Sequence, residues 1–254
     1  MEYVLKNADK DDFITFLDSD DFVKTDYAQN LLSIASENDC ELVQCDYEKG
    51  GNDSFSDTAQ NIDVFVKSGE EMLLDRRLKS QSCAKIYKLS LFEKVRFPMG
   101  VLNEDEFTTY RVVYISKKVA ITTLKAYYYY QHPGSIMDQI ANRLKNNPHL
   151  FDWLDAYKER IAFFESQGKP EQVMRTHEKI CTDVILRYCE QMFLKKENRD
   201  DALTNGEYIR IYKKSYPLMK KRKGIALKHR IMYLLFYIMP YSAVIPGKIL
   251  GLRK

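Results

Sequence analysis

The sequence predicts an α/β fold in which a partial mixed sheet is followed by a helical region. Over the first 140 residues, short apolar runs alternate with helical patterns in the order strand, helix, strand, loop, strand, helix. From about residue 142, apolar residues recur at steps of three and four, the spacing of an amphipathic helix. The chain is 45% hydrophobic, which is enough for a packed core. We therefore expect an α/β domain over residues 1–140 and a helical region over residues 141–254.

The first strand is predicted at residues 13–17, after a stretch that resembles the end of a helix. The run is apolar, contains β-prone residues and stops at acidic residues, as a buried parallel strand does. Thr25 is the expected N-cap of the next helix, which continues to about Asn38 with apolar residues at helical spacing. These two elements begin the alternating pattern.

The pattern then repeats along the chain. Residues 41–47 alternate between apolar and polar as a strand does, and residues 49–61 form a loop rich in Gly, Asn, Asp and Ser. Residues 62–66 are predicted to form another short strand. Ser68 is the expected cap of a short helix that contains Met72. The succession favours a mixed α/β sheet.

The remaining α/β segment is predicted to contain one helix and two strands. Residues 104–116 have a helical pattern and begin with acidic residues, which suit the positive end of the helix dipole. Residues 119–123 and 125–131 are predicted as two strands, the second containing four consecutive tyrosines. In the helical region, Gly-Lys-Pro at residues 168–170 ends one helix and begins another.

Cysteine content and charge exclude several classes of protein. The five cysteines form no CxxC pair and their number is odd, so a disulfide framework or a structural zinc site is not expected. Residues 1–63 contain 16 Asp or Glu and 4 Lys or Arg, a net charge of −12. Residues 201–254 contain 2 Asp or Glu and 12 Lys or Arg, a net charge of +10. The acidic end suggests cation binding and the basic end an anionic partner. With no secretory signal visible, a reducing cytoplasm fits best.

The clearest candidate site follows the first predicted strand. Asp18 and Asp20 would point the same way if the extended backbone continued, because side chains repeat every two residues. In open α/β sheets, ligands bind at the carboxyl ends of strands. Two neighbouring carboxylates suit Mg²⁺ or Mn²⁺, which keep coordination positions for phosphate oxygens. The alternative is a solvated turn, since Asp and Ser are common turn residues.

Two more segments carry candidate residues. Residues 97–106 form a loop with Pro and Gly that leads to Glu104 and Asp105 at a helix start, which alone is more simply an acidic first turn. Residues 127–136 place His132 after the last predicted strand. A histidine there could bind a metal ion or a phosphate, although a lone histidine more often does neither.

Taken in this order, the three segments resemble the second half of a family 2 glycosyltransferase of the GT-A fold, of the bacterial polysaccharide type. Residues 83–88, Cys-Ala-Lys-Ile-Tyr-Lys, also resemble the family's Asn-Lys-Leu-Tyr-Arg stretch, with Ala84 in place of a polar residue. The resemblance covers about residues 10–137. It implies an inverting transfer of a sugar from a nucleotide-sugar, such as a UDP-sugar, to a lipid-linked saccharide in surface or capsular polysaccharide synthesis.

The resemblance also implies roles for individual residues. Asp20 would coordinate Mn²⁺ or Mg²⁺ on the donor diphosphate, and Asp18 would assist through the nucleotide ribose or metal-bound water. Asp105 would be the general base that deprotonates the acceptor hydroxyl, with Glu104 also contacting substrate. His132 would contact the metal or the diphosphate. Lys85 would lie near the diphosphate, a structural lysine being the alternative.

The resemblance further implies that a first half is missing. Relatives begin with strands that hold the nucleotide base, whereas 12 residues precede Phe13 in this sequence. We expect the first strand to have an exposed edge and the chain alone to bind a sugar nucleotide weakly or not at all. An upstream segment or a second chain would supply the missing half of the sheet.

The basic C-terminal segment predicts contact with an anionic membrane surface. Residues 220–230 contain six Lys or Arg, and the apolar run that follows over residues 231–239 is too short to span a bilayer. We expect a cytoplasmic protein with an interfacial segment at the inner face of the cell membrane. The alternative is a helix packed on the rest of the protein with a solvated basic face. A nucleic-acid partner is not expected, because no recognised nucleic-acid-binding signature is evident.

Two other functions stay open. The chain could be an inactive pseudo-enzyme or a membrane-associated scaffold that keeps the second half of the fold. A haloacid-dehalogenase-type phosphatase also uses Asp-x-Asp after an apolar strand. Phe22, however, stands where that chemistry has Thr or Val, and the later segments have no place in it.

Overall fold

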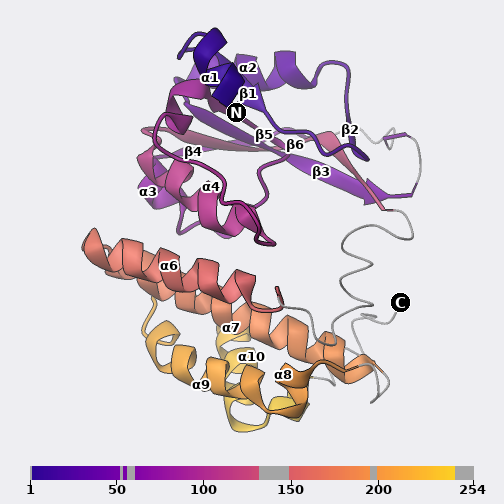
Figure 1. Cartoon of the computed structure of the whole chain (residues 1–254), viewed down its shortest axis with the longest axis vertical. Helices are drawn as coiled ribbons and strands as arrows, with labels where there is room; N and C mark the ends of the chain where they lie inside the picture. The colour runs from indigo at the N-terminus through magenta and orange to yellow at the C-terminus, as the bar shows by residue number, and fades with distance from the viewer. Residues whose placement is uncertain (1, 52–53, 56–60, 132–148, 195–198, 244–254) are drawn as a thin grey trace. The chain divides into compact units, whose positions relative to one another are not determined.

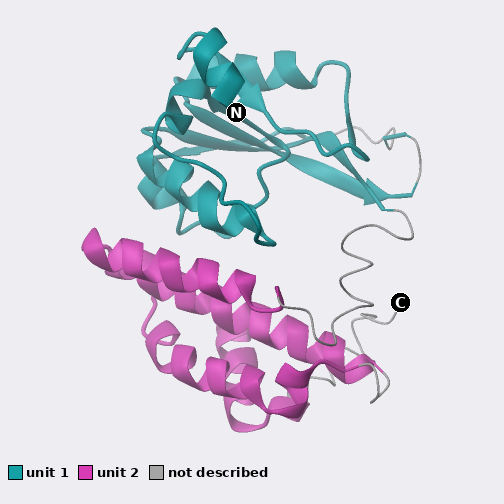
Figure 2. Ribbon diagram, in the orientation of Figure 1, with its two compact units in different colours: residues 1–135 teal, residues 136–254 magenta. Residues whose placement is uncertain are grey.

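The computed structural model of the chain describes residues 2–51, 54–55, 61–131, 149–194 and 199–243. The chain divides into two compact units, Met1–Ser135 and Ile136–Lys254, which have different colours in Figure 2. The first unit is a mixed α/β structure and the second is helical, which confirms the predicted fold class. The boundary expected near residue 140 falls outside the described residues.

The described strands of the first unit form one six-stranded mixed sheet (Figure 1). They follow the order β1-β5-β3-β6-β2, and β4 also pairs with β6. Within this described sheet, β3 and β6 are parallel and the other pairs are antiparallel. The strands are β1 (Phe13–Thr15), β2 (Phe22–Val23), β3 (Leu42–Gly50), β4 (Val64–Lys67), β5 (Lys85–Lys88) and β6 (Val119–Tyr130).

The first strand differs from the prediction in length and in partner. β1 is half-buried and pairs antiparallel with β5, so the prediction of a buried parallel strand is wrong. The apolar run continues beyond β1 because the Phe16 ring packs edge-on against Tyr87, Phe92 and Phe97. β1 stands at one end of the order of described strands, as the expected exposed edge requires.

β6 is one continuous strand of 12 residues, where the sequence predicted two. It pairs with β3 along most of its length, with an irregular register around Asp46. Its two ends have different antiparallel partners, β4 near Val119 and β2 near Tyr127. The continuous pairing with β3 explains why no break separates the two predicted strands.

Helices cover both faces of the sheet (Figure 1). α2 (Tyr27–Asn38) packs on one face, where its buried side chains join those of β3 and β6. α3 (Gly69–Met72) and α4 (Glu104–Ile115) pack on the other face. The unit also contains α1 (Glu2–Asn7) and the short 3-10 helix η1 (Leu89–Phe92). α4 thereby carries the second acidic segment along the sheet.

The two predicted helix caps have different outcomes. Ser68 caps α3 as expected: its hydroxyl accepts a hydrogen bond from the N–H of Glu71, and the Glu71 side chain accepts from the N–H of Ser68. The cap expected at Thr25 is wrong, because α2 begins at Tyr27 and Asp26 occupies the N-cap without a side-chain hydrogen bond.

The second unit contains α6 (Asp152–Ser166), α7 (Pro170–Phe193), α8 (Asp201–Thr204), α9 (Glu207–Met219), α10 (Leu227–Ile238) and the 3-10 helix η3 (Pro240–Ala243). The break predicted at residues 168–170 separates α6 from α7, with Pro170 at the first position of α7. Within the described part of the chain, no helix has both the length and the apolar character that a membrane crossing needs.

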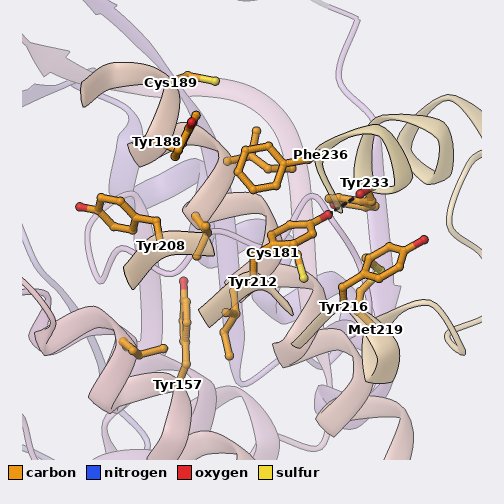
Figure 3. Close-up of a cluster of buried hydrophobic side chains, with 14 of the residues drawn as sticks. Tyr157, Cys181, Tyr188, Cys189, Tyr208, Tyr212, Tyr216, Met219, Tyr233 and Phe236 are labelled. Carbon is orange, nitrogen blue, oxygen red and sulfur yellow. Dashed lines mark hydrogen bonds between the residues drawn. The ribbon is translucent and has the colours of Figure 1, made fainter. Parts of the chain in front are cut away.

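The core of the second unit is rich in tyrosine (Figure 3). The buried hydroxyls have partners: Tyr208 donates to Oδ2 of Asp200 at 2.6 Å, and Tyr212 donates to the carbonyl of Tyr233 at 2.7 Å. The unit also buries the carboxylate of Glu178, which accepts a 2.8 Å hydrogen bond from Arg222. Arg222 belongs to the basic segment and is thus part of the folded unit.

Candidate active site

The acidic segment after β1 forms a tight turn at the surface. The N–H of Asp21 donates to the carbonyl of Asp18 at 3.1 Å; Asp20 is exposed, and Asp18 reaches the surface with part of its side chain covered. Partial burial raises the pKa of the Asp18 carboxyl, and the negative charges of Asp21, Asp20 and Glu104 raise it further. The acidic turn and the start of α4 are therefore close enough to repel one another.

Asp21 anchors this turn to β6. Its Oδ2 accepts a 2.5 Å hydrogen bond from the hydroxyl of Tyr127, and its Oδ1 accepts a 2.9 Å bond from the N–H of Tyr130. The same Tyr127 hydroxyl also lies 3.4 Å from the N–H of Asp18. We did not predict these roles, although both Asp21 and Tyr127 belong to segments that the sequence analysis selected.

The second acidic segment begins α4. Asn103 precedes it with φ 59°, a left-handed conformation that Asn tolerates better than most residues. Burial raises the pKa of Asp105. The hydrogen bonds from the side chain and backbone of Ser82 and the positive charge of Lys85 lower it, but each by less. Oδ1 of Asp105 is buried and has no hydrogen-bond partner among the described residues. An unpartnered carboxylate oxygen with raised basicity suits a group that accepts a proton.

Cys83 lies between the two acidic segments. Burial raises the pKa of its thiol to about 11, and the charges of Asp18 and Asp105 both contribute to the increase. The thiol is therefore neutral at neutral pH and adds no negative charge to the site. We predicted neither Ser82 nor Cys83 as a site residue, although Cys83 begins the 83–88 stretch and Ser82 directly precedes it.

Lys85 is fully buried beneath this site. Its ammonium donates to the main-chain carbonyls of Gln81 and Cys83, and it forms no ion pair with a described residue. Burial lowers the pKa of Lys85 to about 8, although the charge of Asp105 acts in the opposite direction. This environment favours a structural lysine over a direct ligand of a donor diphosphate.

The 81–85 segment has an unusual backbone at Ala84, whose φ is 55°. Left-handed backbone is costly for most residues and is several times more frequent for Asn. An asparagine at this position would therefore adopt the conformation at lower cost than the alanine. Ser82 and Lys85, which flank this stretch in the sequence, both lower the pKa of Asp105.

The structure brings together five of the six predicted site residues: Asp18, Asp20, Glu104 and Asp105 are connected through their charges, and Lys85 lies near Asp105. The sixth, His132, lies outside the described residues. Among the residues that the structure describes, no group of three or more His, Cys, Asp and Glu side chains is arranged to hold a metal ion.

The chain is similar in sequence to proteins named as glycosyltransferases. It is 26% identical to glycosyltransferase GlyA of Streptococcus pneumoniae serotype 4 (strain ATCC BAA-334 / TIGR4) over 170 residues, which are 62% of this chain and 24% of GlyA. It is 29% identical over 175 residues to EpsH of Bacillus subtilis (strain 168), provisionally named a glycosyltransferase, with 65% and 49% of the two chains covered. The chain thus spans less than half the length of these relatives. No protein-family model matches it.

The fold is similar to that of residues 1–349 of S. aureus TarS, crystallised in complex with UDP-GlcNAc. The TM-score is 0.57 and the identity 14%, with 85% of this chain and 60% of that chain covered. At such low identity the likeness concerns the fold alone. The sequence and fold comparisons together confirm the expected relationship to glycosyltransferases, whereas the assignment to family 2 and to the GT-A fold stays a prediction.

Proposed function

We propose that the chain is the catalytic part of an inverting, metal-dependent family 2 glycosyltransferase. It moves a sugar from a nucleotide-sugar, most simply a UDP-sugar, to a lipid-linked saccharide in the synthesis of a surface or capsular polysaccharide. The observation that carries the proposal is the convergence of Asp18 with Glu104, which brings the two acidic segments together. The names of GlyA and EpsH and the UDP-GlcNAc bound by TarS support this choice of reaction.

Asp105 is the general base in this proposal. Its unpartnered Oδ1 accepts the proton of the acceptor hydroxyl while the acceptor oxygen attacks the anomeric carbon and the nucleoside diphosphate leaves from the opposite face. Burial raises the pKa of Asp105 and so strengthens it as a base, while Ser82 holds the carboxylate in place. A base of this kind contributes about 10²–10⁴-fold to the rate. The exposed Glu104, next to Asp105, contacts the substrate.

Asp18 and Asp20 are the proposed ligands of Mn²⁺ or Mg²⁺, and their chemistry fits such an ion. The pKa of Asp18 is raised by partial burial and then by the negative charges of Asp21, Asp20 and Glu104, and a bound cation would offset that charge. A site with two carboxylates also suits Mg²⁺, which commonly takes its other ligands from water and substrate phosphates. When bound, the ion would stabilise the charge on the departing diphosphate. His132 stays a proposed contact of the metal or the diphosphate.

We also propose a cellular location for the protein and a source for the missing part of its nucleotide site. A lipid-linked acceptor requires a protein at the inner face of the cell membrane, reached from the cytoplasm. The outer edge of β1 offers backbone groups to another strand, because β1 ends the order of described strands. We propose that a further segment or a second chain pairs there and supplies the other half of the nucleotide site.

Ligand-observed saturation-transfer NMR with UDP-GlcNAc and Mg²⁺ tests the donor site and detects weak binding. We expect saturation of the nucleotide-sugar signals by the wild-type chain and its loss in the Asp18→Asn/Asp20→Asn double variant. Glu93→Gln is the matched control, because Glu93 is an exposed carboxylate that pairs with Lys10 away from the acidic turn. Signals of equal strength in the double variant would exclude these aspartates as donor ligands. No signal with the wild type, even at millimolar donor, would contradict a donor site formed by this chain on its own.

A further inference from the structure

α10 has one face in the core and one in solvent. Tyr233 and Phe236 are at most 2% exposed and belong to the core of the second unit. On the other side, a stripe of five apolar side chains is 45–73% exposed. The stripe consists of Leu227, Ile231, Leu234, Leu235 and Ile238. At 100° per residue these five positions fall within about 100° of the helix circumference, so they form one continuous surface.

The cations of the basic segment divide into two groups. Arg222 binds the buried Glu178, and Arg230 donates to the carbonyls of Ile225 and Arg222. These two arginines therefore stabilise the fold. The remaining four are exposed and form no ion pair with a described residue: Lys220, Lys221, Lys223 and Lys228.

A small hollow lies where the stripe meets these lysines. It has a volume of about 230 Å³ and is lined mainly by apolar side chains from α9 and α10, among them Met219 and Ile231. Lys220 and Arg230 also line it. The hollow therefore combines an apolar interior with positive charge, the two properties of a site for an anionic amphiphile.

The charge of the surrounding sequence selects the partner. Residues 208–254 contain 12 Lys or Arg and no Asp or Glu. A protein partner for the stripe would bring its own polar rim, whereas a bilayer with anionic headgroups matches both the apolar stripe and the one-signed charge beside it. α10 has 12 residues, a length of about 18 Å, and so it is too short to cross the hydrocarbon layer.

We propose that the stripe and its hollow form a docking surface for an anionic lipid bilayer. α10 lies in the plane of the interface, its stripe enters the acyl boundary, and the four free lysines contact headgroup phosphates. The hollow takes part of one anionic lipid. The inference gives a place and an orientation to the membrane contact of the proposed function, but it rests on the second unit alone and its test needs no sugar transfer.

Flotation of the full chain with vesicles tests the proposal. We expect the wild type to float with vesicles of phosphatidylcholine and phosphatidylglycerol and to bind pure phosphatidylcholine much more weakly. Ile231→Gln/Leu235→Gln should reduce binding by roughly tenfold or more, because both side chains leave the apolar boundary. Lys221→Gln/Lys223→Gln should reduce it by roughly tenfold and lower its salt dependence. Leu32→Gln, a change of an exposed leucine on α2, should have no effect.

Circular dichroism and thermal unfolding show whether each variant is folded. Because the substituted side chains are exposed, the spectrum and the Tm should match those of the wild type. Equal flotation of folded wild type and folded Ile231→Gln/Leu235→Gln would overturn the proposal. Equal binding to neutral and anionic vesicles would overturn the role of the lysines. Sedimentation of the wild type as a dimer that the double apolar variant abolishes, without vesicle binding, would reassign the stripe to self-association.

Discussion

The hydroxyl of Tyr127 donates a 2.5 Å hydrogen bond to Oδ2 of Asp21. This contact joins β6 to the acidic turn that carries Asp18 and Asp20. Charge-assisted hydrogen bonds of this length are among the stronger ones in proteins. The position of the proposed metal ligands therefore depends on a tyrosine far from them in sequence.

Tyr127→Phe should loosen the acidic turn. Because the hydroxyl is lost while the ring stays in the core, we expect a destabilisation of about 1–2 kcal/mol, measured by urea unfolding. Donor binding should weaken several-fold. Tyr47→Phe is the control, since the Tyr47 hydroxyl has no hydrogen bond with a described residue and should change neither property. Identical donor binding by wild type and Tyr127→Phe would show that the turn does not need this contact.

Lys85 should make the stability of the protein increase at alkaline pH. Its pKa in the folded protein is about 8, below the ordinary 10.5, so the folded state releases this proton before the unfolded state does. Stability should therefore rise between pH 8 and 10.5, by up to about 3 kcal/mol. Lys85→Met removes this contribution, so its pH dependence should lack the rise. Superimposable stability profiles of the two proteins would contradict this prediction.

Lys85 also acts on the proposed base. Its positive charge lowers the pKa of Asp105, so Lys85→Met should raise that pKa and move the acidic limb of the transfer rate to higher pH. Carbon-13 NMR titration of the Asp105 carboxyl measures the same shift without any turnover. Lys85→Arg, which keeps a positive charge, should restore most of the shift if it folds. An Asp105 titration unchanged by Lys85→Met would remove the positioning role of the lysine.

Asp105→Asn should abolish transfer and stabilise the fold. Loss of the base should lower the rate by about 10²–10⁴-fold. Burial raises the pKa of Asp105 above its unfolded value, so stability falls as the pH rises from the unfolded to the folded pKa, and the full cost persists above that range; Asn avoids this cost. We expect a higher Tm at pH 7.5, by roughly 2–4 °C, and little gain below about pH 3, where the carboxyl is protonated in both states. Persistent turnover in this variant would refute the assignment of the base.

Gly69 should tolerate no side chain. An alanine Cβ at this position would lie 1.8 Å from the carbonyl oxygen of Val113 and 2.5 Å from that of Ser116, both near the end of α4. We expect Gly69→Ala to destabilise the protein by about 3 kcal/mol, measured by thermal unfolding. Gly100→Ala should cost only about 1 kcal/mol, because its φ is +75° but the space around it is open. Equal losses would mean that α4 shifts to accommodate the methyl group.

The elements that the sequence predicted best have strong local signals. The capping box at Ser68 and the acidic start of α4 depend on hydrogen bonds and dipoles within a few residues. Apart from the cap expected at Thr25, the errors concern pairing between distant segments. Nothing in residues 13–17 shows that β1 pairs antiparallel with β5, and nothing near Lys125 shows that β3 keeps β6 continuous.

In the candidate site, too, the residues with local sequence signals were predictable and the contacts between distant segments were not. Asp18 and Asp105 were predictable as acidic residues at the ends of elements, and their proximity was predictable only through resemblance. The supporting residues Ser82, Cys83 and Tyr127 act through contacts across the fold, which a single sequence does not reveal. Burial of Lys85 also depends on the assembled sheet, so its sequence position alone suggested a ligand and a structural residue equally.

The ion pair between Glu178 and Arg222 limits where the chain can be shortened. A protein ending at residue 219 would take Arg222 away from the buried Glu178, which would keep Arg175 at 3.2 Å, and would remove Tyr233 and Phe236 from the core. Loss of one partner of a buried pair typically costs about 3–5 kcal/mol, and the missing aromatic rings add to this. A natural or engineered variant that lacks α10 and η3 should therefore also lose the fold of the second unit. Point substitutions on the outer surface of α10 are the safer means of separating folding from lipid attachment.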